Sequence, residues 1–555
     1  MPLWASRVGP FNNPSETYEY YRLPFCRPPK IETRLLTLGE VLESHRLVNT
    51  LFDLSFRTDR DFEALCGKRE LTAQEVRKFR DAIDADYYFQ MFYDDLPLWG
   101  FIGKSEEEGG QLRHKLFTHF HFDIAFNGDK VIEINVSTDP ARTVDISAGV
   151  ELPEVEFSYS VKWKASNIAY GDRMQKYTRY SFLPQHLEIH WFSIINSCVT
   201  VLLLTGFLAT VLMRILKNDF LKYSRELEDG AEEMEETGWK YVHGDVFRFP
   251  KGLSLFASIY GTGTQLFLVT LVVFALSLAG TFYPYNRGQQ FTAIIVAYSL
   301  TGSVAGYCSA GLYKQMGGTA WVRNLLVTAT IFSLPLLLCF SCLNTVAISY
   351  GSSAALPFGT IVILCIIWLL VAFPLTVLGG IAGKNRTGDF HAPCRTTKYP
   401  REIPPLPWYR TSVPQMLCAG FLPFSAVYIE LYYIFATIWG HKLYTIYSVL
   451  FIVFILLIIT TAFITIALTY FQLAVEDHRW WWRSVLCGGS TGLCIYAYCF
   501  YYFAARSDMS GLMQTSFFFG YMGVVCYGFF LMLGSIGFRA SLIFVRYIYS
   551  RVKTD

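Results

Sequence analysis

The sequence predicts an α+β membrane protein, in which an N-terminal lumenal domain, mainly β and sandwich-like, precedes a nine-helix transmembrane bundle. Two observations favour this fold class. Charge is uneven, because residues 1–190 hold 23 of the 47 lysines and arginines while the remaining 365 residues hold 24. Long apolar runs also recur after residue 190 between short polar loops. We therefore expect three parts: the lumenal domain at 1–190, the bundle at 191–538 and a cytosolic tail at 539–555.

The first 190 residues contain strand patterns and one clear helix start. An Asn127-Gly128 turn between two alternating runs predicts a β-hairpin over residues 122–136. Thr72 and Glu75 have the spacing of a capping box before an apolar periodic stretch, which predicts a helix. A small sheet sandwich with one or two short helices accounts for both signals.

Nine apolar runs follow, each of roughly 20 residues, which is the length that crosses ~30 Å of hydrocarbon as a helix. Such runs could instead be buried helices of a soluble core, but nine in succession favour membrane spans. The runs cover residues 191–213, 256–282, 291–312, 325–349, 357–381, 413–438, 443–471, 484–505 and 515–538.

Lysine and arginine are concentrated in alternate loops of the predicted bundle. One set of loops, which includes the tail, holds 21 of these residues, and the intervening loops hold three, Arg287, Lys442 and Arg506. Positive residues accumulate on the cytosolic side, so we expect the N-terminal domain in a lumen and the C-terminus in the cytosol. A lumenal domain normally follows a signal peptide, and since the first residues have no apolar core, we expect the sequence to lack that start.

The composition and motifs argue against several functions. A formal net charge of +2 offers no basic face for nucleic acid. The sequence has no nucleotide-binding loop, nucleophile elbow or zinc-protease motif, so we expect no cofactor and no enzyme activity. His119 and His121 alternate on one predicted strand near His114, but packed histidines are favoured over a metal site because no carboxylate or cysteine has matching spacing. Residues 401–407 have the spacing of a polyproline ligand, although a proline-stiffened loop is favoured.

Two covalent modifications are expected in the lumenal domain. Of the 13 cysteines, only Cys26 and Cys66 lie there, so one intramolecular disulfide is available to them. Two buried free thiols are the alternative. Asn135 begins an Asn-Val-Ser sequon and is a candidate glycosylation site, although it falls within a predicted strand.

Polar and small residues inside the predicted spans suggest two further features. Glu430 lies within the sixth run, where a carboxylate costs ~2.5–3.5 kcal/mol on insertion scales, so we expect it to face a cavity or a partner. A protonated, purely structural glutamate is the alternative. Gly302 and Gly306 have the spacing of a close helix contact, either within the bundle or with a foreign helix, and contact within the bundle is the more common.

Several motifs together resemble the nonaspanins, the transmembrane 9 superfamily, and most of all its plant members. The resemblance covers essentially the whole chain, and one lumenal domain with nine spans is the layout of that family. The matching segments are residues 8–18, 94–100, 157–163, 189–194, 243–248, 356–360, 421–424, 429–434 and 476–483.

This resemblance implies a protein of Golgi and endosome membranes that helps other membrane proteins, notably clients with glycine-rich spans, to reach their compartment. It also implies two signals near the C-terminus. The end of the chain, Lys553, Thr554 and Asp555, resembles the family's Golgi retention signal, which binds coatomer. The segment Phe544, Val545, Arg546, Tyr547, Ile548 and Tyr549 resembles its export signal, with plain continuation of the last helix as the alternative. The alternative function is a transporter or channel that uses Glu430.

Overall fold

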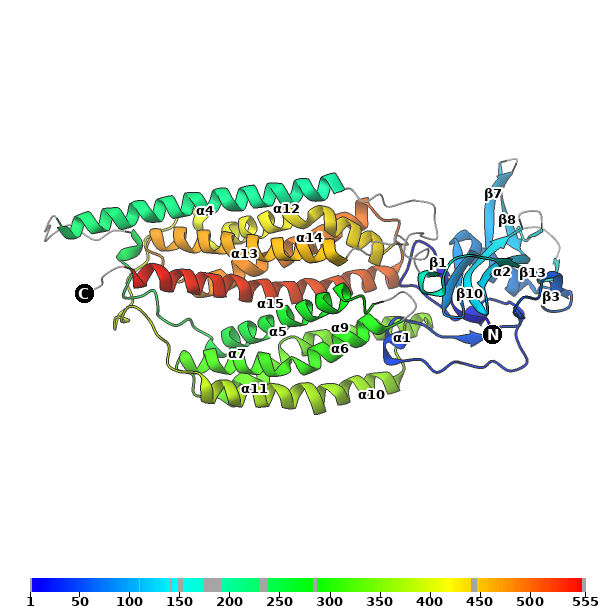
Figure 1. The fold of residues 1–555 in the computed structure, drawn as a ribbon, viewed down its shortest axis with the longest axis horizontal. Helices are drawn as coiled ribbons and strands as arrows, with labels where there is room; N and C mark the ends of the chain where they lie inside the picture. The colour runs from blue at the N-terminus through cyan, green and yellow to red at the C-terminus, as the bar shows by residue number, and fades with distance from the viewer. Residues whose placement is uncertain are drawn as a thin grey trace.

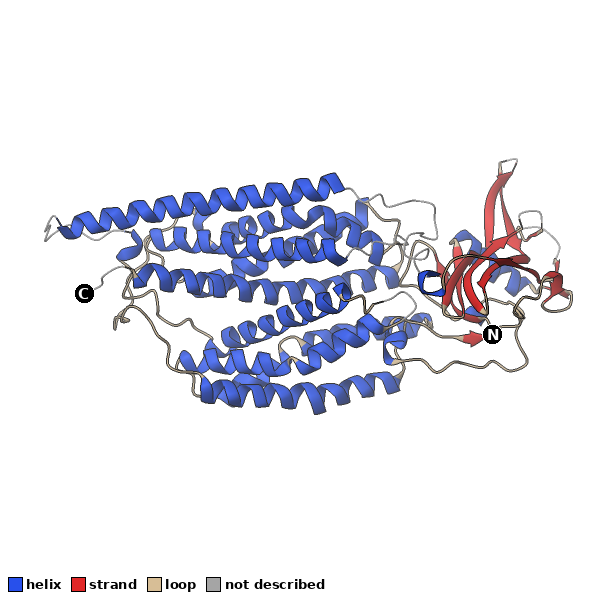
Figure 2. Cartoon of the chain, viewed as in Figure 1, coloured by secondary structure: helices blue, strands red, loops and turns tan. Residues whose placement is uncertain are grey.

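The computed structural model describes residues 2–108, 110–139, 142–147, 153–173, 191–228, 238–282, 287–440 and 447–551. Within these ranges, a β domain lies at one end of an elongated bundle of helices (Figure 1). Strands are confined to that end, and the remainder is helical (Figure 2). The predicted fold class, a β-rich domain followed by a helical membrane bundle, is confirmed.

The β domain packs two four-stranded sheets around one apolar core. One sheet has the strand order β2-β1-β5-β6 and the other β10-β9-β13-β3, in which β9 and β13 are parallel. Buried side chains of both sheets, such as Phe89 and Phe122, belong to the same hydrophobic cluster, so the arrangement is a sandwich. The strands are β1 (Trp4–Pro10), β2 (Val48–Asn49), β3 (Arg60–Ala64), β5 (Tyr87–Tyr93), β6 (Leu96–Phe101), β9 (His119–Asn127), β10 (Lys130–Thr138) and β13 (Ser158–Ala165).

Both local predictions for this domain are confirmed. Strands β9 and β10 form an antiparallel hairpin in which Asn127 pairs with Lys130, and Gly128 at the turn has a φ of 60°, a conformation that favours glycine. Thr72 and Glu75 form a capping box at the start of α2 (Ala73–Asp84). Smaller elements complete the domain: α1 (Leu38–Leu42), a sheet of β7 (Gly103–Glu108), β8 (Gln111–Phe117) and β11 (Thr143–Asp145), and a pair of β4 (Arg69–Glu70) with β12 (Glu154–Val155).

Long helices make up the rest of the described chain, and some spans consist of two helical pieces joined end to end. The helices are α4 (Trp191–Glu228), α5 (Leu253–Leu278), α6 (Gln289–Leu300), α7 (Gly302–Gln315), α8 (Trp321–Thr330), α9 (Ser333–Tyr350), α10 (Phe358–Ile367), α11 (Phe373–Arg386), α12 (Ser412–Ile438), α13 (Tyr447–Ala474), α14 (Trp480–Ala505) and α15 (Leu512–Ser550). A short π-helical stretch, Trp368–Ala372, joins α10 to α11.

Within the described residues, eight helical segments are long and apolar enough to cross a membrane. The predicted run at 484–505 falls in α14, which is as long as α5 but is not among the eight. Its sequence is rich in glycine, serine and aromatic residues, and it packs between α12 and α15. The hydropathy of the helices therefore supports eight spans, and α14 is a ninth helix of the bundle that is recognised by its packing.

The last helix is longer than the sequence predicted. α15 has 39 residues and continues unbroken through the expected boundary at 538/539 to Ser550. A helix of that length extends roughly 58 Å at 1.5 Å per residue, which exceeds the hydrocarbon thickness. Most of the segment expected as a tail is therefore the end of this helix.

Candidate functional site

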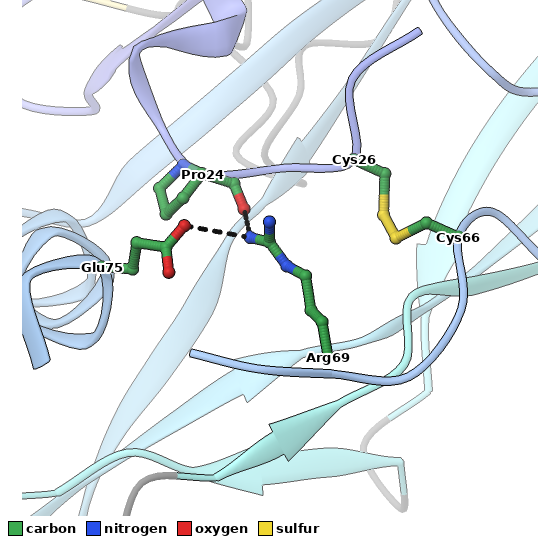
Figure 3. Close-up of a disulfide and its surroundings, with 5 residues drawn as sticks. All are labelled: Pro24, Cys26, Cys66, Arg69 and Glu75. Atoms are coloured by element: carbon green, nitrogen blue, oxygen red, sulfur yellow. Dashed lines mark hydrogen bonds and ion pairs between the residues drawn. A yellow bond between two sulfur atoms is a disulfide. The ribbon is translucent and has the colours of Figure 1, made fainter. Parts of the chain in front are cut away.

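The expected disulfide between Cys26 and Cys66 is present in the β domain, where the two Cα atoms lie 6.0 Å apart (Figure 3). Beside it, Arg69 donates a hydrogen bond to the carbonyl oxygen of Pro24 and lies 3.5 Å from a carboxylate oxygen of Glu75. The disulfide and this ion pair attach the extended segment around Cys26 to the start of α2.

Asn135 lies on β10, the edge strand of its sheet. Its side chain is exposed and donates a hydrogen bond to Glu133 on the same strand. An edge position leaves one side of the strand open, so an attached glycan would not displace a neighbouring strand. Glycosylation of Asn135 stays a prediction.

His114, His119 and His121, the three histidines singled out from the sequence, are bonded to serine and aspartate side chains. The ring nitrogens of His119 lie 2.8 Å from Ser158 Oγ and 3.0 Å from Ser160 Oγ. His114 Nε2 lies 2.6 Å from a carboxylate oxygen of Asp84. Burial lowers the pKa of His119, which favours its neutral form. No group of three or more His, Cys, Asp or Glu residues with metal-site geometry occurs among the described residues.

The N-terminal loop of the β domain is inserted into the adjacent end of the bundle. This loop carries the 8–18 motif, and its contacts reach the turn after α9 and the start of α15. The contacts are a hydrogen bond from the Ser510 amide to Asn13 Oδ1 at 3.0 Å, one from the Ser15 amide to Gln514 Oε1 at 2.9 Å, and one from Ser352 Oγ to the Thr17 carbonyl at 2.6 Å. The motif therefore joins the β domain to the bundle.

A second junction is centred on Arg287, just before α6. Its guanidinium lies 3.1 Å from carboxylate oxygens of both Glu40 and Asp95 and 4.3 Å above the ring of Phe92. Burial alone would raise the pKa of Glu40, but hydrogen bonds from Thr37 and the charge of Arg287 outweigh burial and hold that pKa below its ordinary value. In the sequence, Arg287 is only one of three positive charges in the predicted lumenal loops, and no local pattern indicates this role.

Glu430 is buried within the bundle, as expected, with only 3% of its surface exposed. It lies on α12, within electrostatic range of Tyr433 on the same helix and of Cys198 on α4. Elsewhere on α12, the ring of Tyr428 meets that of Tyr498 on α14 edge to face, with the centroids 5.3 Å apart. The buried carboxylate therefore lies inside the bundle on α12, a helix that packs against α4.

The predicted glycine contact joins two helices of the bundle. A Cβ atom added at Gly306 on α7 would lie 1.9 Å from the carbonyl oxygen of Thr376 on α11, and one added at Gly379 would lie 1.9 Å from that of Ser303. Because the two backbones are in direct contact, no residue with a Cβ atom fits at either position unless the helices move apart. These glycines therefore have an internal partner and are not available to a foreign helix.

Two motifs that lie far apart in the sequence meet at the end of the bundle opposite the β domain. Asp245, 1% exposed, accepts hydrogen bonds from Arg248, from Thr397 Oγ1 at 3.1 Å and from the Arg401 amide at 3.2 Å. Burial opposes ionisation, but the hydrogen bonds from Arg248 and Arg401 outweigh it, so the pKa of Asp245 is lowered. Trp480 of the second motif donates to the Val246 carbonyl at 2.8 Å.

The second motif carries its own buried ion pair. Asp477 and Arg483 are 3.3 Å apart, and Arg483 also lies 3.3 Å from Gln415 Oε1 at the start of α12. His478, which belongs to the second motif, is within electrostatic range of Asp245 of the first motif, and burial lowers the pKa of His478. These contacts fix the loops at this end of the bundle.

The expected export signal lies in the last turns of α15. Four of its six residues are buried, and Tyr549 donates a hydrogen bond to the carbonyl oxygen of Trp239. Trp239 Nε1 and the Tyr470 hydroxyl both donate to Asp219 of α4, at 3.0 and 2.6 Å, a cluster that no local sequence pattern signalled. The exposed fractions are 9% for Phe544, 0% for Val545, 53% for Tyr547, 0% for Ile548 and 1% for Tyr549. The expected retention signal, Lys553 to Asp555, lies outside the described residues.

Comparison with known proteins identifies the family. A family model described as Endomembrane protein 70 matches residues 17–512. Transmembrane 9 superfamily member 3 of Arabidopsis thaliana is 62% identical over 559 residues, which cover all of this chain and 94% of the relative. Transmembrane 9 superfamily member 1 of Mus musculus is 46% identical, and the alignment covers all of this chain and 93% of the relative. A Dictyostelium discoideum protein named "Putative phagocytic receptor 1b" is also 46% identical, over 94% of its length.

No solved structure matches the chain. The family match covers most of the sequence, and the eight apolar helices agree with it. The chain therefore belongs to the Endomembrane protein 70 family, the transmembrane 9 superfamily, and is an integral, multi-pass membrane protein.

Proposed function

We propose that this protein sorts other membrane proteins in Golgi and endosome membranes, as a cargo receptor or chaperone for clients with glycine-rich spans. Family membership supports the proposal, and a Dictyostelium relative is named as a receptor. Buried ion pairs hold the loops at both ends of the bundle, so the proposed role depends on the outer surface of the bundle and on the C-terminus.

The observation that carries the proposal is the outer face of α4. Among the described elements, this helix packs chiefly against α13 and α12. Its other side exposes Gly206, where an added Cβ would meet no atom within 4 Å. Leu203 and Phe207 beside it are 68% and 70% exposed. A small residue flanked by apolar side chains allows close approach of a second helix, as a glycine-rich client span requires.

Co-purification tests this surface. We expect Gly206→Leu to reduce the recovery of a tagged client that has a glycine-rich span, because the larger side chain keeps the helices apart. Gly359→Leu on α10 is the matched control, since Gly359 also has open space around it. Equal recovery with both variants would exclude the α4 face as the client site.

We further propose that the β domain is lumenal and that the C-terminus recruits coatomer. The last described helix, α15, stops at Ser550 at the end of the bundle opposite the β domain (Figure 1). Lys553 and Asp555 offer opposite charges at fixed spacing to a charged groove. We expect Lys553→Ala combined with Asp555→Ala to move the protein from the Golgi to later compartments and to abolish coatomer binding. Unchanged Golgi residence in the double variant would refute the retention signal.

Transport is the second candidate, and the burial of Glu430 favours it. A carboxylate with 3% exposure inside a membrane bundle is typical of ion and proton pathways. Purified protein in vesicles would then conduct an ion or a proton, and Glu430→Gln would abolish the flux. The absence of flux from vesicles that contain correctly folded protein would remove this candidate.

A further inference from the structure

The connection between α11 and α12 contains an exposed, proline-rich segment at residues 401–407. Figure 1 shows this connection crossing the end of the bundle that lies opposite the β domain. The sequence of the segment is Arg-Glu-Ile-Pro-Pro-Leu-Pro, in which Pro404 and Pro407 have the Pro-x-x-Pro spacing of a polyproline ligand. The proposed sorting function makes no use of this segment.

The prolines hold the segment in an extended conformation. Each proline ring fixes φ at about −65°, and the residue before a proline is kept out of the helical region. These two effects together cover residues 403–407 without a gap. Pro407 has a φ of −63° and a ψ of 154°, which are polyproline II values. Among the described residues, 402–406 take part in no hydrogen bond, which is typical of a polyproline II helix.

Both ends of the segment are attached to the rest of the molecule. At its start, the Arg401 amide donates a hydrogen bond to Asp245 Oδ2 at 3.2 Å, and the Arg401 guanidinium carbon lies 3.6 Å from the centroid of the Tyr241 ring. At its end, the Arg410 amide donates to the Pro407 carbonyl oxygen at 3.0 Å. Because the segment is stiff and anchored, it loses little conformational entropy when it binds a partner.

The prolines lie on the outer side of the segment. A polyproline II helix has three residues per turn, so Pro404 and Pro407 share one edge, and both are exposed. Ile403 and Leu406 share another edge, and both are half-buried. The apolar edge therefore faces the protein, and the proline edge is open. Stiffening of the loop alone does not require the prolines to face outward.

Positive charges flank the prolines. Arg401 and Arg410 are exposed, Glu402 is the single acid between them, and among the described residues neither arginine forms an ion pair with a carboxylate. Trp408, two residues before Arg410, is 76% exposed. A partner for this surface needs an aromatic groove for the prolines and a carboxylate at its rim for an arginine. An SH3-type domain, which recognises Pro-x-x-Pro segments through an aromatic-lined groove, fits this description.

We propose that residues 401–410 are a docking ligand for an SH3-type domain of a soluble protein. The aromatic groove of the domain takes Pro404 and Pro407, and a carboxylate at its rim pairs with Arg401. The Arg401 side chain donates from Nη1 to the Tyr241 carbonyl oxygen at 2.8 Å, which leaves Nη2 for that carboxylate. The proposal rests on the proposed orientation, in which this end of the bundle is cytosolic, and is otherwise independent of the sorting of clients.

Binding to purified protein tests the ligand. The full chain in nanodiscs, which leave both faces accessible, is titrated with a purified SH3 domain that prefers Arg-x-x-Pro-x-x-Pro peptides. We expect Pro404→Ala combined with Pro407→Ala to weaken binding about tenfold or more, because both groove contacts are lost. Pro393→Ala combined with Pro400→Ala is the matched control, since it removes two exposed prolines from the same connection and should leave the affinity unchanged.

Thermal unfolding in the nanodiscs shows that each variant is folded, which all four substitutions in an exposed connection should permit. No binding of the SH3 domain to the wild type would overturn the proposal. Equal affinity for the two double variants would also overturn it, because the prolines at 404 and 407 would then not be the contact.

Recruitment in cells tests the orientation separately. The same SH3 domain, fused to a fluorescent protein and expressed in the cytosol, should collect on membranes that contain the wild type. It should not collect on membranes that contain the Pro404→Ala, Pro407→Ala double variant. Binding in nanodiscs without recruitment in cells would refute the proposed orientation and with it the cytosolic partner, whereas failure to bind in nanodiscs would refute the ligand in either orientation.

Discussion

Arg287 Nε lies 3.1 Å from Glu40 Oε1, and this ion pair joins the bundle to the β domain with both side chains largely buried. The backbones beside the pair are also in contact, because a Cβ added at Gly39 would lie 1.9 Å from the carbonyl oxygen of Gly288. Together with the inserted loop at residues 13–17, this contact fixes the domain on the end of the bundle.

Removing the arginine of this pair should destabilise the junction. We expect Arg287→Ala to lower the free energy of unfolding by about 3–5 kcal/mol, because it leaves the buried Glu40 carboxylate without its counter-charge. Arg34→Ala is the control: Arg34 is an exposed partner of Asp95 at 3.5 Å, so its loss should cost less than about 1 kcal/mol. Thermal unfolding in detergent measures both. Equal losses of stability would show that the Arg287 pair does not hold the domain.

The stability of the β domain should depend on pH through His45. Burial lowers the pKa of His45, and the charges of Arg7 and Arg287 lower it further, while the nearby Glu43 carboxylate opposes them. The unfolded chain therefore takes up a proton near pH 6.5 that the folded domain does not, so stability falls as the pH drops below about 6.5. Unfolding midpoints measured in steps from neutral to mildly acidic pH should show this decline.

A His45→Gln variant checks the assignment. It removes one of two described histidines of the domain whose pKa is lowered, His119 being the other, and should make the decline below about pH 6.5 shallower. Glu40 does not titrate in this window, because its pKa is held below its ordinary value of 4.5. A decline that is as steep in the variant as in the wild type would assign the pH dependence to another group.

The disulfide should contribute measurably to the stability of the β domain. Its cysteines are 40 residues apart, and closing a loop of that length contributes about 3–4 kcal/mol in the chain-entropy model. We expect Cys26→Ser combined with Cys66→Ser to lower the free energy of unfolding by that amount. The direct check is mass spectrometry of non-reduced peptides of this protein after its passage through the secretory pathway. Free thiols at both Cys26 and Cys66 would contradict the pairing.

The contact between α7 and α11 should tolerate no side chain. Gly306→Ala places a methyl group against the Thr376 carbonyl oxygen. We expect it to lower the free energy of unfolding by at least about 1–3 kcal/mol, because the backbone of α7 or α11 must move. Gly359→Ala, where an added Cβ meets open space, should have little effect. The measurement is the unfolding midpoint of each variant. Equal midpoints for Gly306→Ala and Gly359→Ala would show that α7 and α11 can move apart without loss of stability.

Local patterns were sufficient for much of the fold. The hairpin at residues 122–136 and the capping box at Thr72 depend on neighbouring residues, and both are present as predicted. The apolar runs likewise needed no tertiary information. α14 shows the limit of hydropathy: many of its residues are buried among other helices, so they need not be as apolar as residues that face lipid.

The polar contacts could not be predicted, because they join residues that are distant in the sequence. Asp219 meets Tyr470 across 251 positions, and Arg287 meets Glu40 across 247. The continuation of α15 beyond 538 was only the alternative interpretation of residues 544–549, for a related reason. Its last turns are stabilised by packing against Trp239 and neighbouring residues, whereas the sequence showed only the end of an apolar run.

The distribution of a client tests the sorting function most directly. A reporter with a glycine-rich span is followed at the Golgi and at the cell surface, in cells that lack this protein and in cells that express the wild type or Glu430→Gln. The account predicts that the reporter is mislocalised without the protein and that both forms restore it, because sorting does not use the buried carboxylate. A reporter distribution that is the same with and without the protein would contradict the account, and rescue by the wild type alone would favour transport through Glu430.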